Sequence, residues 1–245
     1  MAKSSVIAFD LYGTLLSTES IAEELAKTYG QDVAKPLAAL WRRYQLEYTW
    51  RINSMGLYRT FSEITRGALQ HAVAESGLAL SEDDANRLMQ AYNALRVFPD
   101  VPGALDLVGK TPGVEALIFS NGTGEMVSAS VTTSPDLKPF AGLFGRTVTV
   151  DSVAVFKPDK RTYDHLVQEV GKQESPSDVW LITANPFDVV GATAAGLRSA
   201  WIDRAGRGWV DKLGDVIGEV KPTLVVSGVD EAVGEIIKRT SVPSV

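Results

Sequence analysis

The sequence of 245 residues contains no cysteine and only two histidines, His71 and His165. Without cysteine, the chain can have no disulfide, no thiolate nucleophile and no cysteine-ligated zinc. The first residues lack the apolar segment and cleavage site of a signal peptide, and no apolar run is long enough to span a membrane. We therefore expect a cytoplasmic protein that does not contact membranes. The two histidines lie far apart within helical patterns, where a structural or surface role is the simpler interpretation.

Positive charge is also scarce. The formal net charge is -6 and the pI is about 5.1, and no basic stripe is present that would bind nucleic acid. Hydrophobic residues make up 45% of the chain and charged residues 22%, which is ordinary for a globular protein. The length suits one large α/β domain or one domain with an insert. We expect an enzyme whose chemistry uses carboxylates, hydroxyls and basic side chains.

Five short runs rich in β-branched and other apolar residues have the pattern of buried strands in a parallel sheet. They cover residues 6–10, 114–120, 146–150, 178–183 and 198–203. Helical patterns follow several of these strands. This alternation predicts an α/β fold with a Rossmann-like, doubly wound parallel sheet.

The stretch from residue 17 to residue 97 interrupts the alternation, because only helical patterns occur in it. Within residues 35–55, apolar side chains recur every three or four positions, which indicates packing between helices. These side chains are Trp41, Tyr44, Tyr48, Ile52 and Met55. We interpret residues 17–97 as an all-helical cap, and residues 1–16 and 98–245 as the α/β core. Residues 241–245 are expected to form a loose tail.

Polar residues follow the predicted strands, at the edge where open α/β sheets bind ligands. They are Asp10, Ser120, Asn121, Lys157, Thr183, Asn185 and Asp188. Each residue alone has an ordinary explanation as a turn, helix-capping or surface residue. All of them together, at successive strand ends, indicate an active site.

The segments FDLYGTLL, IFSNGT, VFKPDKRTY and ITANPFDVVGA resemble the four signature loops of the haloacid dehalogenase superfamily. The segment LWRRYQLEYTWRINSMGLYRTF is similar to the cap region of its L-2-haloacid dehalogenase family. The resemblance extends over the whole chain. It implies an enzyme that hydrolyses (S)-2-haloalkanoic acids to (R)-2-hydroxyalkanoic acids and releases a halide ion. It also implies a homodimer.

The resemblance further implies a covalent mechanism with no metal and no cofactor. Asp10 would attack the C2 carbon of the 2-haloacid and form an ester, which water then hydrolyses. Asp188 would orient or deprotonate this water, because no histidine is placed to do so. Lys157 would hold Asp10 ionised, and with Thr14 it would stabilise the developing oxyanion.

The other implied roles concern the substrate and the leaving group. The groups assigned to the substrate carboxylate are Ser120 and the backbone amides of Leu11 and Tyr12. The residues assigned to the halide are Arg42, Asn121 and Phe187. Tyr163 and Phe61 would complete the wall of the site. The further catalytic residues are Tyr163 and Asn185, and the further substrate-binding residues are Phe61 and Thr183. Without the resemblance, Arg42 has an equally good interpretation as a surface arginine on an amphipathic helix.

The residue at position 12 distinguishes hydrolysis of phosphate esters from displacement of a halide. Most members of the superfamily are phosphatases with a second aspartate there, which protonates the leaving alkoxide and accelerates the reaction by roughly 10²–10⁴-fold. Tyr12 is a weak acid at neutral pH, since the reference pKa of tyrosine is about 10. A halide needs no proton to depart. The loop at residues 183–188 also lacks the additional carboxylate that Mg²⁺ usually requires.

Two alternatives remain open at this point. One is a phosphatase of the same superfamily that acts on a small phosphate ester. The other is a weakly catalytic small-anion binding protein that uses Arg42, Arg43 and Lys157 beneath the cap. Arg43 stands where the dehalogenase family commonly has glutamine, and Thr183-Ala184 stand where two serines are usual. These departures leave the reaction type intact and bear on rate and substrate range.

Overall fold

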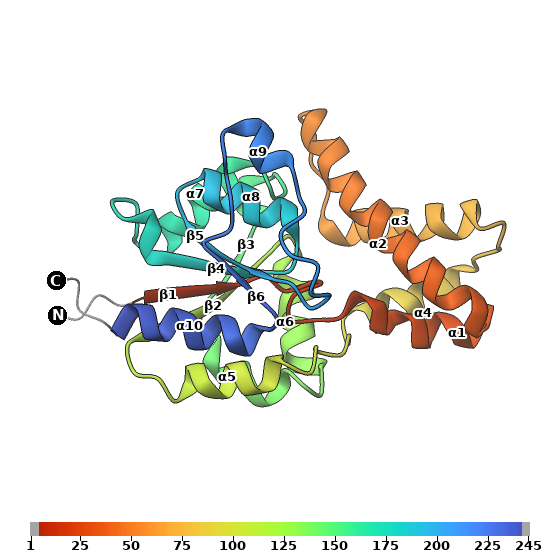
Figure 1. Cartoon of the computed structure of the whole chain (residues 1–245). Coiled ribbons are helices and arrows are strands. Elements are labelled where there is room, and N and C mark those ends of the chain that lie inside the picture. Colours follow the sequence, from red (N-terminus) through yellow and green to blue (C-terminus); the bar gives the residue numbers. More distant parts are fainter. Residues whose placement is uncertain (1–4, 242–245) are drawn as a thin grey trace.

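A computed structural model of the chain describes residues 5–241, which form a sheet covered by helices and a separate lobe of helices (Figure 1). The strands are β1 (Ser5–Phe9), β2 (Val114–Ser120), β3 (Thr147–Thr149), β4 (Val179–Thr183), β5 (Arg198–Ile202) and β6 (Leu224–Val226). All neighbouring strands are parallel, in the order β3-β2-β1-β4-β5-β6. This confirms the predicted doubly wound fold.

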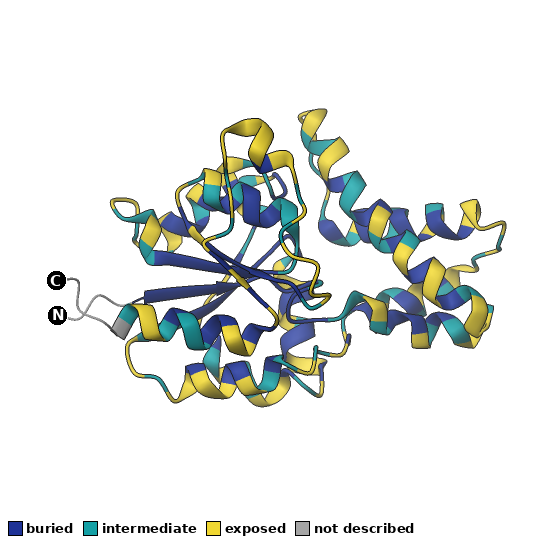
Figure 2. Ribbon diagram, viewed as in Figure 1, coloured by how far each residue is buried: buried dark blue, intermediate teal, exposed yellow. Residues whose placement is uncertain are grey.

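The predicted strands agree with the observed ones to within one residue at each end. The exception is β6, which the sequence analysis did not identify because three residues are too few to show a strand pattern. The central strand β1 is buried on both faces, and Val6 to Phe9 are each at most 1% exposed. Figure 2 shows the same burial along the neighbouring strands. An apolar run without alternation is therefore what this position in the sheet requires.

Helices cover both faces of the sheet (Figure 1). On one face lie α5 (Val101–Gly109) and α10 (Val229–Ser241), and on the other lie α7 (Lys160–Glu169) and α8 (Pro186–Ala194). The remaining helices of this lobe are α6 (Gly124–Thr133), α9 (Leu213–Ile217) and the 3-10 helices Lys138–Leu143, Asp151–Val153 and Pro176–Asp178. The loose tail predicted for residues 241–245 lies outside the described residues, apart from Ser241 at the end of α10. No helix of residues 5–241 is both long and apolar enough to cross a membrane.

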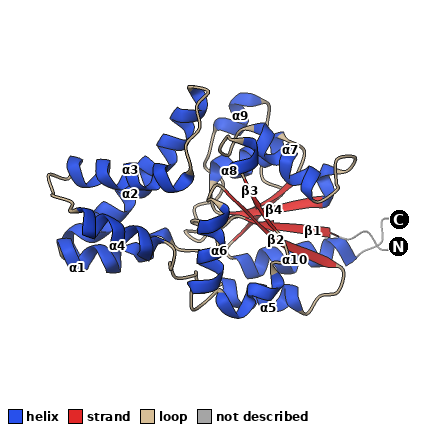
Figure 3. Ribbon diagram, turned by 180° about the vertical axis from the view of Figure 1, so that it is seen from behind, coloured by secondary structure: helices blue, strands red, loops and turns tan. Residues whose placement is uncertain are grey.

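The second lobe consists of helices only, as expected for an inserted cap (Figure 3). Its helices are α1 (Ala22–Tyr29), α2 (Gln31–Ser54), α3 (Phe61–Glu75), α4 (Glu82–Tyr92) and the 3-10 helix Thr18–Ile21. The chain leaves and re-enters the core side by side, because Ser17 N donates to Arg96 O at 2.8 Å and Leu16 pairs with Val97 in an antiparallel bridge. We retain the division at residues 16/17 and 97/98 as a proposal.

The apolar stripe predicted on α2 is correct for four residues and wrong for the fifth. Trp41 and Tyr44 are buried against the neighbouring helices, and Tyr48 and Ile52 are partly buried there. Met55 is 66% exposed. The physical reason is that α2 ends at Ser54 and the chain turns at the following glycine, so Met55 extends beyond the helices that cover the stripe.

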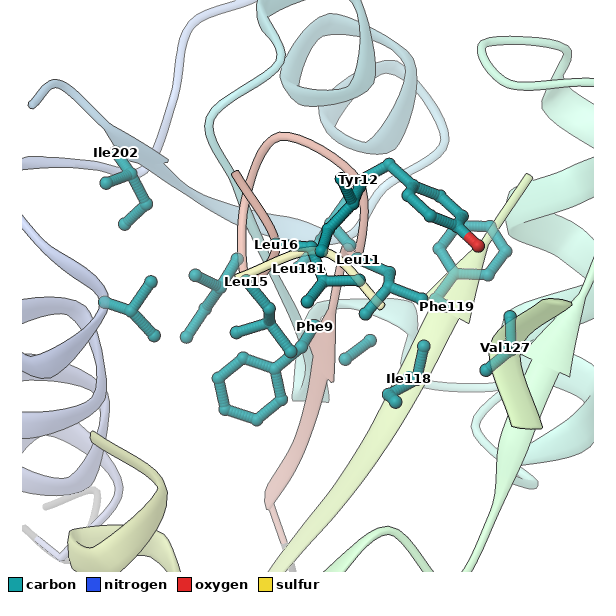
Figure 4. Close-up of a cluster of buried hydrophobic side chains, with 14 of the residues drawn as sticks. Phe9, Leu11, Tyr12, Leu15, Leu16, Ile118, Phe119, Val127, Leu181 and Ile202 are labelled. Carbon is teal, nitrogen blue, oxygen red and sulfur yellow. The ribbon is translucent and has the colours of Figure 1, made fainter. Parts of the chain in front are cut away.

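The loop after β1 is anchored by apolar side chains on both sides of its polar residues (Figure 4). Leu11, Leu15 and Leu16 are fully buried and belong to the main hydrophobic core. Gly13 has a φ of +89°, which is a left-handed conformation that glycine adopts without strain. The turn at Gly13 folds the loop back on itself, so that Leu15 N and Leu16 N both donate to Leu11 O. Burial of the leucines therefore fixes the backbone that carries Asp10 and Thr14.

Candidate active site

Side chains from four loops of the core and from two cap helices converge between the lobes. They surround a small cavity of about 10 Å³. The lining residues are Asp10, Tyr12, Arg42, Leu46, Phe61, Asn121, Lys157, Asn185 and Phe187. All but Leu46 were predicted as site residues. Leu46 follows Arg42 by four positions on α2 and therefore lies on the same helix face, which is the sequence signal that could have identified it.

Asp10 is buried and accepts hydrogen bonds at both carboxylate oxygens. Its Oδ2 accepts from Thr14 Oγ1 at 2.7 Å, from Asn185 Nδ2 at 2.7 Å and from Thr183 Oγ1 at 3.2 Å. Its Oδ1 is 3.2 Å from Lys157 Nζ. Three predicted site residues thus hold one oxygen of Asp10, and among residues 5–241 the other oxygen accepts from Lys157 alone.

Lys157 is 1% exposed and binds two carboxylates at once. Its Nζ donates to Asp188 Oδ2 at 2.9 Å, to Asp10 Oδ1 at 3.2 Å and to Phe119 O at 2.9 Å. Its backbone N–H donates to Asn121 Oδ1 at 2.9 Å, which fixes the loop before α7 against the loop after β2. A buried lysine is tolerated only with such partners. When all three groups are ionised, this cluster carries one net negative charge.

Asp188 is fully buried in the first turn of α8. Burial raises the pKa of Asp188 to about 6, the charge of Lys157 opposes this rise, and the charge of Asp10 adds to it. Tyr163 Oη donates to Asp188 Oδ1 at 2.8 Å. Burial also raises the pKa of Tyr163 well above its usual value, so the phenol remains protonated and acts as a donor.

Tyr163 was predicted as a catalytic residue that helps to complete the site wall, and its catalytic role stays a prediction. Tyr163 is fully buried behind Asp188 and does not line the cavity. The physical reason is its close packing against α8: a Cβ atom on Gly191 would lie 2.4 Å from Tyr163 Oη. Tyr163 therefore acts on the site through Asp188.

The phenol of Tyr12 is directed away from Asp10. Its ring packs between the rings of Phe61 and Tyr92, with centroids 5.6 Å and 5.5 Å away. Its Oη lies 3.4 Å from Ser130 Oγ on α6. Burial raises the pKa of Tyr12 above its usual value, so the hydroxyl stays protonated. Tyr12 supplies an apolar wall and no acid at the position where a phosphatase would have one.

Ser120 and Leu11 lie beside the cavity without lining it. Ser120 is buried at the end of β2, and its Oγ accepts from Gly122 N at 3.0 Å. Within residues 5–241, no acceptor is found for the backbone N–H groups of Leu11 and Tyr12. These two amides are therefore available to an anion at the end of β1.

Arg42 points into the site and is not a surface residue. Its Nη2 donates to Tyr12 O at 2.9 Å and approaches Asn185 Oδ1 at 3.4 Å, and its Nη1 donates to Gln45 Oε1 at 2.6 Å. On the opposite side of the cavity, Phe187 makes an edge contact with the ring of Trp50 at 5.3 Å. The cap thus contributes an arginine side chain and part of the apolar wall of the site.

The donor set does not suit a bound Mg²⁺. Among residues 5–241, no group of three or more histidine, cysteine or acidic side chains is arranged to hold a metal ion. The ammonium group of Lys157 lies between the carboxylates of Asp10 and Asp188, where a cation shared by the two acids would have to bind. Because Mg²⁺ demands several oxygen ligands, these residues do not fit it.

An α/β core with a helical cap and with these strand-end loops corresponds to a known class of hydrolase. A family model described as haloacid dehalogenase-like hydrolase matches residues 5–196. The chain belongs to this family.

Several relatives match more than four-fifths of the chain. Haloacetate dehalogenase H-2 of Moraxella sp. (strain B) is 36% identical over 217 residues, which cover 87% of this chain and 92% of that protein. The (S)-2-haloacid dehalogenase of Pseudomonas sp. (strain YL) is 34% identical over 203 residues, with coverages of 82% and 83%. Among solved structures, the L-2-haloacid dehalogenase from Xanthobacter autotrophicus with chloropropionic acid covalently bound matches with a TM-score of 0.81 and 26% identity. That match covers 95% of this chain and 98% of the other.

Proposed function

We propose that the protein is an (S)-2-haloacid dehalogenase that converts (S)-2-haloalkanoic acids and water into (R)-2-hydroxyalkanoic acids and halide. The observation that carries this proposal is the environment of Asp10. It is a buried carboxylate with one oxygen held by three donors and the other facing a lysine, beneath a cap arginine. The names of the relatives support the same reaction.

The first step is displacement of the halide by Asp10. Because Oδ2 already accepts three hydrogen bonds, Oδ1 is the oxygen with electron density available for attack. Asp10 Oδ1 forms a bond to C2 as the carbon–halogen bond breaks, and the halide leaves with the bonding pair. Arg42 offers the departing anion its positive charge. The apolar walls formed by Tyr12, Leu46 and Phe61 exclude water, which strengthens this interaction.

Binding of the substrate carboxylate orients C2 toward Asp10. The free amides of Leu11 and Tyr12 and the hydroxyl of Ser120 are the groups that we assign to it. Anion binding by backbone N–H groups at a strand end is common in α/β proteins. With the carboxylate and the halide bound at separate places, only the (S)-enantiomer presents the rear of its carbon–halogen bond to Asp10.

The second step is hydrolysis of the ester at the Asp10 carbonyl. Asp188 accepts a proton from water as the water attacks Cγ of Asp10. The bond between Cγ and the ester oxygen then breaks as Asp188 returns this proton to the departing oxygen, which releases the hydroxy acid, and the second proton of the water passes to solvent. Lys157, Thr14 and Asn185 donate to the oxygens of the tetrahedral intermediate. The product hydroxyl thus carries an oxygen from Asp10, and the carboxylate regains an oxygen from water.

The phosphatase alternative is less well supported by the site. Tyr12 is protonated, hydrogen-bonded to Ser130 and turned away from the leaving group. The anion-binding alternative explains Arg42 but gives no reason for two buried carboxylates beside the pocket, since these repel anions.

One assay separates the three functions. The wild type is incubated with chelator and with (S)-2-chloropropionate, (R)-2-chloropropionate or an aryl phosphate, and chloride and phosphate release are measured. We expect chloride release from the (S)-acid only. Phosphate release without chloride release would favour the phosphatase, and binding without turnover would favour the anion-binding protein. The Asp10→Asn variant is the control for uncatalysed release.

We also propose a cytoplasmic homodimer that binds the halide product. The end of the cap helix supports self-association, because Trp50, Met55 and Leu57 are 38%, 66% and 51% exposed. Sedimentation equilibrium with the wild type and with Met55→Glu tests the dimer, and fractionation of the host cells tests the compartment. Bromide inhibition of chloride release tests halide binding.

A further inference from the structure

Gln45 is a fully buried amide on α2 that no step of the proposed reaction uses. It accepts from Arg42 Nη1 at 2.6 Å and from Tyr92 Oη at 3.0 Å, and it donates to Thr65 Oγ1 at 2.7 Å. We propose that Gln45 is a positioning residue that holds the guanidinium of Arg42 at the leaving halide without neutralising its charge. This inference rests on the proposed function, since it assigns Arg42 to the halide.

The chemistry of its partners fixes the orientation of the Gln45 amide. A guanidinium only donates hydrogen bonds, so the amide oxygen and not the NH₂ group must face Arg42. Thr65 Oγ1 donates to Phe61 O at 2.6 Å and is left to accept from Gln45 Nε2. The hydrogen bonds therefore run from Arg42 through Gln45 and Thr65 to Phe61 O. If the amide of Gln45 were reversed, its NH₂ group would face the N–H donors of Arg42.

The neutral character of Gln45 is the second point. Arg42 contacts three acceptors, which are the amide oxygens of Gln45 and Asn185 and the carbonyl oxygen of Tyr12, and all three are uncharged. Arg204, in contrast, donates to both oxygens of Asp100. A carboxylate partner would neutralise much of the charge of Arg42. An amide fixes the guanidinium and leaves its charge for an incoming anion.

Gln45 also ties Arg42 to the apolar walls of the cavity. Through Thr65 it is linked to Phe61 at the start of α3, and through Tyr92 it is linked to the ring that packs on Tyr12. Phe61 and Tyr12 both line the cavity. Three cap helices thus meet at one amide, which sets the guanidinium and two wall residues relative to each other.

If the role of Gln45 were purely structural, its substitution would destabilise the cap and would not act on the reaction through Arg42. A double-mutant cycle distinguishes the two roles, because residues that act through one another show non-additive effects. The variants are Gln45→Met, Gln45→Glu, Arg42→Ala and both combinations with Arg42→Ala. Thr49→Val is the matched control, since Thr49 is also fully buried on α2 and donates only to Leu46 O.

The measured quantity is the single-turnover rate of ester formation with (S)-2-chloropropionate and (S)-2-bromopropionate, followed by mass spectrometry of the quenched protein. We expect Gln45→Met to lower this rate by about 10- to 100-fold, the effect of misplacing a charge stabiliser. Gln45→Glu keeps the shape and the acceptor, and it should slow the reaction similarly by neutralising Arg42. The loss should be larger for chloride than for bromide, because the poorer leaving group depends more on stabilisation.

In the Arg42→Ala background, neither Gln45 substitution should slow ester formation further, and Thr49→Val should retain the wild-type rate. Additive losses, a normal rate in Gln45→Glu, or equal losses for the two halides would each overturn the proposal. If Gln45→Met fails to fold, the isosteric Gln45→Glu arm decides the test. A wild type that forms no ester with either acid would refute the proposed function instead, so the two failures are distinguishable.

Discussion

Replacing Asp188 by asparagine should make the protein inactive and, relative to the wild type, progressively more stable as the pH rises. The reason is the position of this carboxylate. Asp188 is fully buried, and burial raises its pKa from 3.8 to about 6. Between about pH 3.8 and pH 6, the folded protein holds a proton on Asp188 that the unfolded chain has released. The stability of the wild type therefore falls as the pH rises through this window.

The size of the effect follows from the shift in pKa. A rise of roughly two units corresponds to about 3 kcal/mol, at about 1.4 kcal/mol per unit. Asparagine also has a pH-independent cost. Tyr163 Oη and Lys157 Nζ both donate to Asp188, and an asparagine NH₂ must face one of these donors, at a cost of about 1–3 kcal/mol. The wild type and Asp188→Asn can thus have similar free energies of unfolding at one pH. The change of their difference with pH reports the cost of burying the charge of Asp188.

The assay is urea unfolding of the wild type and of Asp188→Asn at several values between about pH 4 and pH 8. The free energy of unfolding of the variant, minus that of the wild type, should increase by up to about 3 kcal/mol across this range and then remain constant. Titration of groups elsewhere cancels in the difference. A flat difference, or one that decreases with pH, would refute the reasoning. With (S)-2-chloropropionate, the variant should accumulate the ester. Wild-type turnover should decline only well below pH 6, because ester formation removes the charge of Asp10 that helps to raise the pKa of Asp188.

Three further predictions follow from the same geometry. Asp10→Asn should abolish turnover. When the wild type completes a single turnover in heavy-oxygen water, the label should appear in the protein and not in the (R)-hydroxy acid. Label in the first product would mean that water attacks C2. Arg42→Ala should lower kcat by roughly 10²–10³-fold with unchanged folding by circular dichroism; normal activity would remove Arg42 from the site. Gly191→Ala should lower the free energy of unfolding, measured in urea, by about 1–3 kcal/mol, because the added Cβ would displace Tyr163. Gly234→Ala is the control, since a Cβ atom at Gly234 would meet open space.

The sequence was sufficient for the elements whose pattern is set locally. Buried parallel strands appear as apolar runs, and the polar residues that follow them must lie at one edge of the sheet. The sequence alone therefore places Asp10 and Asp188 near each other. β6 was not predicted, because a strand of three residues is too short to show a hydrophobic period. Residues 17–97 show helical patterns alone, and the elements of the structure between Thr18 and Tyr92 are all helices.

What the sequence could not provide is the rotation of each helix against its neighbours. Gln45 and Leu46 are adjacent, yet one joins the cap helices internally and the other lines the cavity. Periodicity alone assigned Met55 to the buried stripe, although Met55 lies just beyond the end of α2 and is 66% exposed. Tyr163 was expected at the surface of the site and lies behind it, because Gly191 allows the ring to approach α8 closely. Such placements depend on tertiary packing, which a single sequence does not display.

The distribution of charge connects the two chemical steps. Before reaction, Lys157 is shared between Asp10 and Asp188, and the charge of Asp10 helps to raise the pKa of Asp188. Ester formation transfers the negative charge of Asp10 to the halide beside Arg42. Lys157 then faces Asp188 alone, so the pKa of Asp188 should fall and its carboxylate should be ionised when water arrives. The first step thereby prepares the base for the second, and neither step requires a proton from Tyr12.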